Sequence, residues 1–402
     1  MDSISTAGGA EVMKRQNRSS VLHVLRKESP VSNAEMARHT GLSVMSVSNI
    51  VKELQACDLV ETTGSGESQG GRKPTLYQLH EQNWVISVAI HVDNIQTAKI
   101  NPQGNIVQVE KKSICGQLRQ NEWAALVCDL IDQLLENTED QARPLGIGVS
   151  APGPVDVDSG TMLHPPNIKA IEQWEVAALL RERYRLPVVL ERDANAAALA
   201  EYWFGSSENK SSMLYVLADQ GIGGGIIFQG KMYRGFLNGA GELGHHTIDM
   251  DGPKCSCGSY GCLEALASGI AMTKKAETMQ NQREAPSSEK QQITLEKIFQ
   301  AAMAEVPLAM QLLEESANYL GVGIANAANI LNPEEIIIGG AIVHGYPAAM
   351  ETISYLVNDR ILYNGNNSMI IKRSQFKEEA QLVGAAAVIL DHLFSNPQLL
   401  MK

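Results

Sequence analysis

Three cysteines that fall within eight residues place the strongest constraint on how this chain folds. Cys255, Cys257 and Cys262 form this group, and His245 and His246 lie shortly before it. Three thiolates and one imidazole complete the tetrahedral shell of a zinc ion and leave no coordination position open, so the metal would be structural. The spacing therefore predicts a zinc site within residues 245–262, with His245 modestly favoured over His246 as the fourth ligand. The alternative is that the three cysteines are free and buried.

Length and composition indicate a soluble chain with more than one domain. The 402 residues are 44% hydrophobic and 19% charged, and a chain of this length is expected to form two or three domains. The sequence contains neither an apolar run of about 20 residues, which could cross a bilayer, nor the pattern of a signal peptide. We therefore expect a cytoplasmic protein without membrane insertion, in which clustered thiols bind metal rather than form disulfides.

The first eighty residues have the pattern of three short helices followed by a hairpin. Apolar residues recur at helical spacing over residues 19–27, which predicts the first helix. Ser32 and Glu35 form a capping-box pattern at the start of a second helix, and Gly41 ends it. A third helix is predicted from about residue 44 to residue 56.

This order of elements predicts a winged helix-turn-helix that binds operator DNA. The third helix would bury Val47, Ile50 and Leu54 and expose small polar side chains that can approach base edges closely. The hairpin would carry a flexible basic tip able to reach the minor groove or the phosphates. The alternative is a packing or dimerisation module with a solvated basic turn. The residues predicted to contact DNA are Ser43, Met45, Ser46, Ser48, Asn49, Lys52, Arg72 and Lys73.

The charge distribution permits DNA binding at this end of the chain. The net charge of the whole protein is -12, which by itself opposes binding to nucleic acid. Residues 1–80 contain nine Lys and Arg against eight Asp and Glu, so their net charge is +1 and the remainder carries -13. The N-terminal segment is therefore the only part without a net repulsion from phosphate.

From residue 85 onward the pattern becomes that of an α/β protein. The predicted elements are strands at residues 85–90, 95–100, 106–109 and 145–149, a helix at 123–136, and a polar, mobile connection at 277–290. A second copy of the strand pattern begins near Met213. Alternating strands and helices imply a sheet that binds ligands at the strand ends.

Three segments of this body carry a more specific resemblance. Residues 242–245 (Glu-Leu-Gly-His) precede the cysteine group, residues 151–156 read Ala-Pro-Gly-Pro-Val-Asp, and residues 191–197 read Glu-Arg-Asp-Ala-Asn-Ala-Ala. Together with the cysteines they resemble the ROK family of repressors and sugar kinases. The resemblance extends over nearly the whole chain, and the N-terminal module is similar to that of the family's xylose and N-acetylglucosamine repressors. It implies an actin/hexokinase-like fold in which two lobes close on a sugar, and usually a homodimer or tetramer.

The resemblance also implies roles for individual residues. Asp193 matches the carboxylate that accepts the proton of the sugar hydroxyl in the kinases, so here it would be the vestigial position of the base. Glu242, His245 and Glu264 match groups that bind sugar hydroxyls, and His245 would also bind zinc through its other nitrogen. Carboxylates suit this task because they accept strong hydrogen bonds from neighbouring hydroxyls. The predicted sugar-binding set is Asn167, Arg192, Asp193, Glu242, His245 and Glu264.

Two departures from the family pattern argue against kinase activity. The family kinases have an aspartate that handles magnesium and phosphate where this chain has His91, and a Gly-Thr pair where it has Asp219 and Gln220. Asp219 would repel ATP phosphates at a cost of about 1–4 kcal/mol per neighbouring charge. Phosphoryl transfer needs both metal and phosphate clamps, and Asp93 would replace the missing carboxylate only if the register were shifted. We therefore expect no catalytic residues.

Arg192 stands where the family usually has an asparagine that binds the sugar. Arginine is always charged and binds carboxylate or phosphate through two parallel hydrogen bonds, so one hypothesis is an anionic sugar as effector. The alternative is that Arg192 turns away from the ligand and pairs with Asp219 or Glu191.

These observations predict an α/β protein with two functional parts. Residues 1–80 would form a winged helix-turn-helix, and residues 81–402 a two-lobed, actin/hexokinase-like ROK domain that binds an effector. We expect a homodimeric repressor of carbohydrate uptake or catabolism genes that leaves its operator when a sugar binds, with Zn²⁺ as a structural cofactor. The alternatives are an active ATP-dependent sugar kinase with a DNA-binding module, and a regulator sequestered by a sugar-transport protein.

Overall fold

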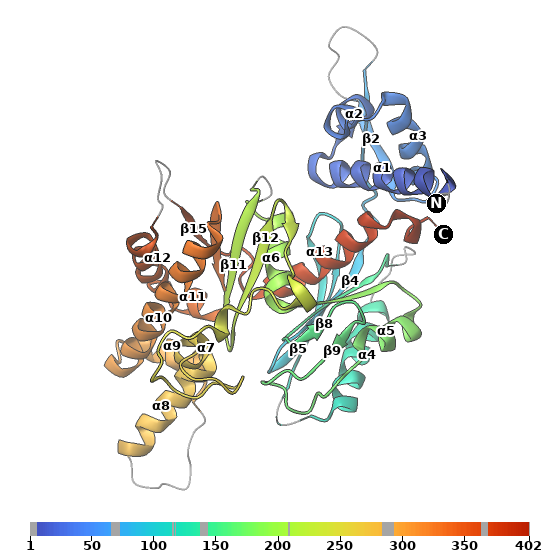
Figure 1. Cartoon of the computed structure of the whole chain (residues 1–402). Helices are drawn as coiled ribbons and strands as arrows, with labels where there is room; N and C mark the ends of the chain where they lie inside the picture. The colour runs from blue at the N-terminus through green and yellow to red at the C-terminus, as the bar shows by residue number, and fades with distance from the viewer. Residues whose placement is uncertain are drawn as a thin grey trace, which may run out of the picture.

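The computed structural model describes residues 6–65, 73–114, 116, 118–136, 144–207, 210–283, 293–362 and 369–401. Figure 1 shows an N-terminal module at one end of a larger body with two lobes. Of the helices in these ranges, none combines the length and the apolar composition that crossing a bilayer requires.

The N-terminal module is a winged helix-turn-helix, as predicted. Its elements are α1 (Thr6–Glu28), β1 (Val31–Ser32), α2 (Asn33–Thr40), α3 (Val44–Gln55), β2 (Val60–Ser65) and β3 (Thr75–Leu79), with the strands in the order β1-β3-β2. The hydroxyl of Ser32 accepts the N–H of Glu35, whose carboxylate in turn accepts the N–H of Ser32, so the predicted capping box begins α2. Gly41 ends that helix with a φ of 71°.

The first helix is longer than the sequence pattern predicts. The predicted helix covered residues 19–27, whereas α1 begins at Thr6. Val21, Leu22 and Leu25 are buried in the core of the module, but the side chains of residues 11–16 are exposed. An exposed helical turn has no apolar stripe, so periodicity alone does not reveal it.

The body consists of two sheets with the same topology, which confirms the predicted repeat and the two-lobed α/β fold. Three strands of each sheet are antiparallel, and two more are added in parallel to the first strand. The first sheet has the order β10 (Val188–Arg192), β7 (Ile147–Ala151), β4 (Val85–Ile90), β5 (Asn94–Ile100) and β6 (Ile106–Ser113). The second has the order β13 (Lys231–Met232), β12 (Ile222–Phe228), β11 (Ser212–Ala218), β14 (Glu335–Gly339) and β15 (Ile370–Arg373).

Two helices, α6 (Asp193–Phe204) and α13 (Ala380–Ser395), form a central layer between the sheets (Figure 1). In β11, alternate residues such as Met213 and Tyr215 pack toward these helices, while Leu214 packs in the separate outer core. The helices cross so closely that a Cβ atom added to Gly384 would lie 2.1 Å from the carbonyl oxygen of Ala196. Glycine at this position therefore sets the distance between the two helices.

The outer faces of both sheets are covered by further helices. The first sheet carries α4 (Gln120–Glu136) and α5 (Val176–Tyr184), with the short hairpin β8 (Val155–Asp156) and β9 (Thr161–Met162) beside them. The second lobe contains α7 (Leu263–Ala267), α8 (Gly269–Arg283), α9 (Leu295–Met303), α10 (Pro307–Leu331), α11 (Ala341–Gly345) and α12 (Ala349–Arg360). Short 3-10 helices are η1 (Phe236–Asn238), η2 (Leu243–His245), η3 (Lys377–Glu379) and η4 (Pro397–Leu399).

One predicted connection is wrong in part. Residues 277–290 were expected to form a polar connection, but α8 continues through Arg283, and residues 284–292 lie outside the described ranges. Residues 277–283 include Glu277, Met279, two glutamines and Arg283. These residues favour a helix by intrinsic propensity without producing an apolar stripe.

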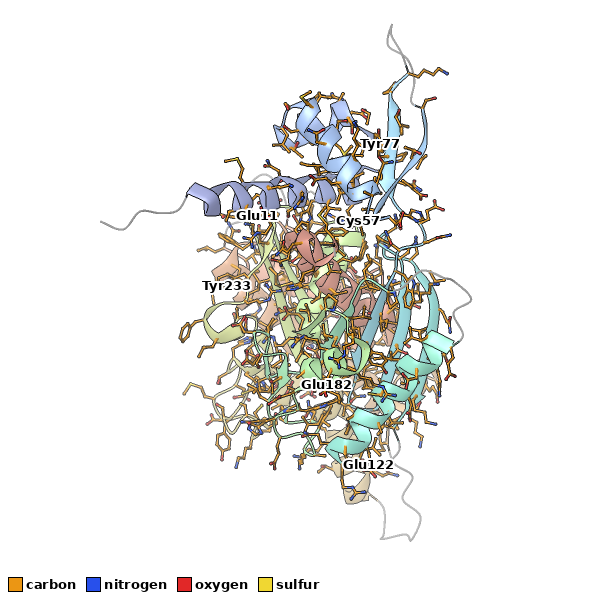
Figure 2. All side chains as sticks on the ribbon, turned by 90° about the vertical axis from the view of Figure 1, so that its right-hand side faces the viewer. Glu11, Cys57, Tyr77, Glu122, Glu182 and Tyr233 are labelled. Carbon is orange, nitrogen blue, oxygen red and sulfur yellow. The ribbon has the colours of Figure 1, made fainter. Side chains whose placement is uncertain are left out.

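The N-terminal module packs against the central layer of the body, as Figures 1 and 2 show. The guanidinium of Arg26 in α1 lies 4.3 Å from the ring centroid of Trp203 and donates a 2.8 Å hydrogen bond to the Trp203 carbonyl. The ring of His23 lies edge-on to Trp203 and Phe394, with centroid distances of 5.8 and 6.0 Å. Burial, with a smaller effect of Arg26, lowers the pKa of His23 to about 4, so its ring is neutral at pH 7.

Candidate functional site

A cavity of about 1600 Å³ lies between the two lobes. It is larger than a single sugar needs, and it is lined by strand ends of both sheets together with loops of the second lobe. All six residues of the predicted sugar-binding set line it: Asn167, Arg192, Asp193, Glu242, His245 and Glu264.

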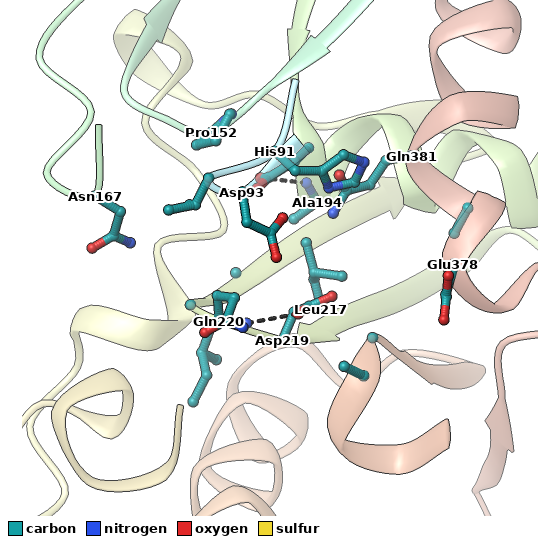
Figure 3. Close-up of a pocket in the computed structure, with 18 of the residues that line it drawn as sticks. His91, Asp93, Pro152, Asn167, Ala194, Leu217, Asp219, Gln220, Glu378 and Gln381 are labelled. Atoms are coloured by element: carbon teal, nitrogen blue, oxygen red, sulfur yellow. Dashed lines mark hydrogen bonds between the residues drawn. The ribbon is translucent and has the colours of Figure 1, made fainter. Parts of the chain in front are cut away.

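Arg192 and Asp193 enter the cavity where β10 ends and α6 begins. Parallel pairing with β7 aligns the carboxyl ends of these strands at the cavity, so the first residue of the following helix faces it. Asp193 accepts a 2.7 Å hydrogen bond from the N–H of Ala194 (Figure 3). The pKa of Asp193 is raised to about 6, mainly by burial and to a smaller extent by the charges of Glu242 and Asp219, whereas the hydrogen bond from Ala194 and the charge of Arg192 oppose the rise.

The partner of Arg192 is neither of the two residues that the sequence suggested. Its Nη1 donates to Oε1 of Glu242, and its Nη2 donates to the carbonyl of Ala240. Asp219 makes no such contact, and Glu191 accepts only the backbone N–H of Arg192, at 3.0 Å. Glu242 lies 50 residues away in the chain, on a loop of the other lobe, so no local pattern marked it as the partner.

Glu191 has its own partner, which sequence reasoning missed. Its carboxylate is fully buried, accepts a 2.7 Å hydrogen bond from Nε of Arg234, and accepts another at 2.9 Å from Asn195. Arg234 and Glu242 belong to the same loop after β13, so two ion pairs connect this loop to the end of β10. Arg234 is separated from Glu191 by 43 residues, and a long-range pair of this kind leaves no signal in a single sequence.

Glu264 and Asn167 approach each other at Gly221. A Cβ atom added to this glycine would lie 2.8 Å from Oε2 of Glu264 and 3.7 Å from Nδ2 of Asn167. Oε2 of Glu264 accepts a 3.0 Å hydrogen bond from the N–H of Ile222, and its other oxygen accepts one from Ser256 at 3.4 Å. The carboxylate is thus held in place beside the cavity, with lone pairs left for a ligand hydroxyl.

The predicted zinc ligands lie together. One ligand atom from each of His245, Cys255, Cys257 and Cys262 falls within 4.8 Å of the others. The sulfur atoms of Cys257 and Cys262 are 3.7 Å apart, and Sγ of Cys255 is 3.6 Å from Nδ1 of His245. Ideal tetrahedral zinc bonds place two sulfur atoms about 3.8 Å apart and a sulfur–nitrogen pair about 3.5 Å apart, so the donor set fits this ion.

The alternative histidine points elsewhere. Nδ1 of His246 bonds to the carbonyl of Leu243, and its Nε2 is buried without a hydrogen-bond partner among the described residues. His245 is therefore the better candidate for the fourth ligand. Its Nε2 lies 3.9 Å from Oε2 of Glu242, on the side of the ring away from the cysteines.

The cavity is also lined by His91, Asp219 and Gln220, the residues on which the prediction against kinase activity rests (Figure 3). Burial lowers the pKa of His91 to about 4, and Nε2 of this neutral ring is buried without a partner in the described ranges. Burial also raises the pKa of Asp219, as do the charges of Asp93 and Glu378. Gln381, buried at the start of α13, also lines the cavity, and no described residue forms a hydrogen bond with its Oε1; sequence reasoning had not identified it.

The predicted DNA contacts divide into two groups by exposure. Met45, Asn49 and Lys52 project from α3 and are exposed, with 77% of the Met45 surface accessible. Ser43 caps α3 by accepting the N–H of Ser46 at 3.1 Å, so its hydroxyl is already used within the protein. Ser46 and Ser48 are half-buried, and Lys73 is exposed at the wing. Arg72 lies outside the described residues.

Two family models match different parts of this chain. A model described as the ROK family matches residues 85–392, and a model described as winged helix-turn-helix DNA-binding matches residues 14–61. The first match covers the two lobes and the cavity, and the second covers α1 to α3.

Curated relatives match nearly the full length. The xylose repressor of Caldicellulosiruptor bescii is 30% identical, over 97% of this chain and 99% of its own. The DNA-binding transcriptional dual regulator NagC of Escherichia coli K12 is 26% identical, over 97% of this chain and 98% of its own.

Solved structures share the fold. A ROK family transcriptional regulator, described as a homologue of the Escherichia coli MLC protein, has a TM-score of 0.81 and 27% identity, covering 97% of this chain and 98% of its own. A ROK family glucokinase from Streptomyces griseus, solved with glucose and AMPPNP, has a TM-score of 0.67 and 28% identity. It covers 76% of this chain and 98% of its own.

The raised pKa of Asp193 predicts a pH-dependent effect on stability. Because the folded-state pKa of about 6 exceeds the ordinary aspartate value of 3.8, ionised Asp193 destabilises the fold, by on the order of 2–3 kcal/mol once the pH exceeds 6. This penalty disappears as pH falls toward 4. We therefore expect sugar-free Asp193→Asn to unfold at a higher temperature than the wild type at pH 7.5, and the difference to shrink at pH 4.5.

Asp156→Asn provides the matched control in the same measurement. Hydrogen bonds from Ser159 lower the pKa of Asp156, so its ionised form stabilises the fold and this variant should not gain stability at pH 7.5. Equal Tm differences for Asp193→Asn at both pH values would contradict the assignment of a buried, ionising carboxyl.

Proposed function

Because this chain belongs to the ROK family, we propose that it is a sugar-responsive repressor of carbohydrate uptake or catabolism genes. One observation carries the proposal: α6 begins at Asp193 in the cavity and reaches Trp203 at the surface of α1, the first helix of the DNA-binding module. The assignment of residues 1–80 to DNA and residues 81–402 to the effector belongs to the same proposal. The curated relatives named above, a xylose repressor and a DNA-binding transcriptional regulator, support it.

A homodimer would place two copies of α3 in successive major grooves of a palindromic operator. The exposed side chains of Asn49 and Lys52 then have distinct roles. An amide such as Asn49 can read adenine through two hydrogen bonds, whereas Lys52 supplies a charge to phosphate. Lys73 at the wing would add a second phosphate contact.

We expect Asn49→Ala to reduce discrimination between operator and unrelated DNA by about 1–3 kcal/mol, because a base contact is lost. Lys52→Ala should weaken binding to both DNAs alike and reduce the slope of log K against log salt by about one. Fluorescence anisotropy with labelled duplexes at several salt concentrations measures both effects.

Lys274→Ala is the control, because Lys274 is exposed on α8 in the second lobe, away from the DNA-binding module. If Lys274→Ala lowered affinity as much as Lys52→Ala does, a contact through α3 would be refuted.

The cavity supports a sugar as the effector. Asp193, Glu242 and Glu264 offer carboxylate oxygens, and Asn167 offers an amide, which matches the alternating donors and acceptors of vicinal hydroxyls. Sugar bound between the lobes would change their relative position, and α6 would carry that change to α1. A ligand shifts such an equilibrium only through its different affinity for the two states.

Arg26 tests this route, because its guanidinium packs on Trp203 at the end of α6 that lies away from the cavity. We expect Arg26→Met to keep the affinities for operator and for sugar separately, while sugar lowers operator affinity at least fivefold less than in the wild type. Parallel titrations of DNA with and without saturating sugar give this ratio. Arg15→Met, an exposed change on the same helix, should leave the ratio unchanged, and an unaltered ratio in Arg26→Met would refute the route.

We also propose Zn²⁺ as a structural cofactor held by His245, Cys255, Cys257 and Cys262. The ion would supply no chemistry to a ligand, because four protein ligands fill its shell. Its role would be to fix the ring of His245, so that Nε2 is presented to the cavity beside Glu242.

Elemental analysis should find about one zinc per chain, and Cys257→Ser should lose it together with most of the affinity for sugar, because a structural zinc site needs all four ligands. Cys57→Ser, which changes a cysteine in the N-terminal module, should retain the metal. Full sugar affinity in a zinc-free Cys257→Ser protein would show that the metal does not position the site.

An active sugar kinase is the second candidate, since a glucokinase shares the fold of the two lobes. The observation against it is that His91 provides no carboxylate for a metal. Asp93, the substitute considered above, does line the cavity, but Asp219 adds a second acid in the same region, where the phosphates of ATP would be repelled. We therefore propose that the protein is not an enzyme. In an ATP-consumption assay over a panel of hexoses and pentoses, the rate with each sugar should equal the rate without sugar. ATP consumption that depends on a sugar would overturn this conclusion.

A further inference from the structure

Given the proposed sugar-binding function, we propose that Arg192 restricts the effector to an uncharged sugar. The guanidinium lies in the cavity, which at first suggests a site for phosphate or carboxylate. Its surroundings lead to the opposite conclusion, because its charge is already paired within the protein.

Both terminal nitrogens of Arg192 already donate hydrogen bonds to protein acceptors. Nη1 bonds to the carboxylate of Glu242. Nη2 bonds to the carbonyl of Ala240 and has longer contacts of 3.4 Å with the carbonyl of Gly224 and the side-chain oxygen of Asn195. An anionic ligand would have to displace Glu242 before it could form the paired hydrogen bonds that make arginine a good anion receptor.

The side chain is also held where it lies. Only 5% of the surface of Arg192 is exposed, and its Cδ is packed so that a Cβ on Gly153 would approach it to 3.1 Å. Pro152 and Pro154 flank this glycine and line the cavity as well. The guanidinium therefore has little freedom to turn away from Glu242 toward a charged group on a ligand.

The surrounding charges oppose an anion too. Asp193 and Glu264 line the same part of the cavity and are acids, and the nearby Arg234 is paired with buried Glu191. Lys111, Arg373 and Lys377 also line the cavity, but they come from β6, β15 and η3 rather than from the segments that carry the predicted sugar residues. A phosphate placed beside Arg192 would meet an ion pair of zero net charge next to further carboxylates.

The Nε donor of Arg192 is not used by the protein acceptors named above. Its Nε is buried and has no hydrogen-bond partner among the residues that the structure describes. A neutral acceptor, such as a hydroxyl or the ring oxygen of a sugar, would satisfy this N–H without disturbing the pair with Glu242. Glu242 meanwhile retains Oε2, which faces His245, for one hydroxyl of the ligand.

The test compares neutral and anionic sugars on the full-length protein by calorimetry. The neutral sugars are D-xylose, D-glucose and N-acetyl-D-glucosamine, and the anionic ones are D-glucuronate and the 6-phosphates of the two hexoses. We expect a neutral sugar to bind at least tenfold more tightly than its anionic counterpart. In Glu242→Gln, which releases the guanidinium, the anionic sugar should gain at least tenfold relative to the neutral one.

Glu296→Gln removes an exposed acid from another part of the cavity and serves as the charge-matched control, with no gain expected. An anionic sugar that binds the wild type as tightly as its neutral counterpart, an unchanged preference in Glu242→Gln, or an equal gain in Glu296→Gln would each overturn the role of Arg192. Operator release is measured in parallel: if no sugar binds and none releases DNA, the proposed function itself fails, whereas release by an anionic sugar refutes only this inference.

Discussion

The crossing of α6 and α13 is the contact on which the rest of the structure depends. Both sheets rest on this pair of helices, and Gly384 allows the helices to approach to a distance at which any side chain would strike the Ala196 carbonyl. The two ends of α6 then have different neighbours: Asp193 faces the cavity, and Trp203 faces α1. A helix of 12 residues spans about 18 Å, so one rigid element connects the two sites directly.

The second organising feature is a set of two ion pairs that connect β10 with the loop after β13. Arg192 with Glu242 and Arg234 with Glu191 join the first lobe to a loop of the second, beside the ligand residues. Buried charges are tolerated only where they are paired and hydrogen-bonded, and Glu191 meets this condition with three donors. The pairs therefore fix the loop that presents Glu242 and, just beyond it, His245. The charges at this part of the cavity therefore depend on contacts between the lobes.

Sequence reasoning succeeded where the signal is local. The capping box at Ser32 and Glu35, the strand at residues 85–90 and the clustering of the three cysteines each depend on neighbours within a few residues, and the structure has them as expected. It failed where the determinant is distant or where no apolar stripe exists. The partner of Arg192 lies 50 residues away, and residues 11–16 of α1 and 277–280 of α8 are helical without buried side chains. The predicted sugar residues line one cavity. Their roles, however, were assigned by resemblance to the family and could not have been inferred from their spacing in the sequence.

The central position of α13 also has a consequence for the order of folding. The hydroxyl of Ser87 in β4 donates to the carbonyl of Leu382 in α13, a residue 295 positions further along the chain. During synthesis the inner face of the first sheet must therefore remain uncovered while the whole of the second lobe is being made. Contacts of such long sequence separation form slowly and leave apolar surface exposed to aggregation. Because α13 lies near the C-terminus, the first sheet lacks its inner cover until almost the whole chain has been made.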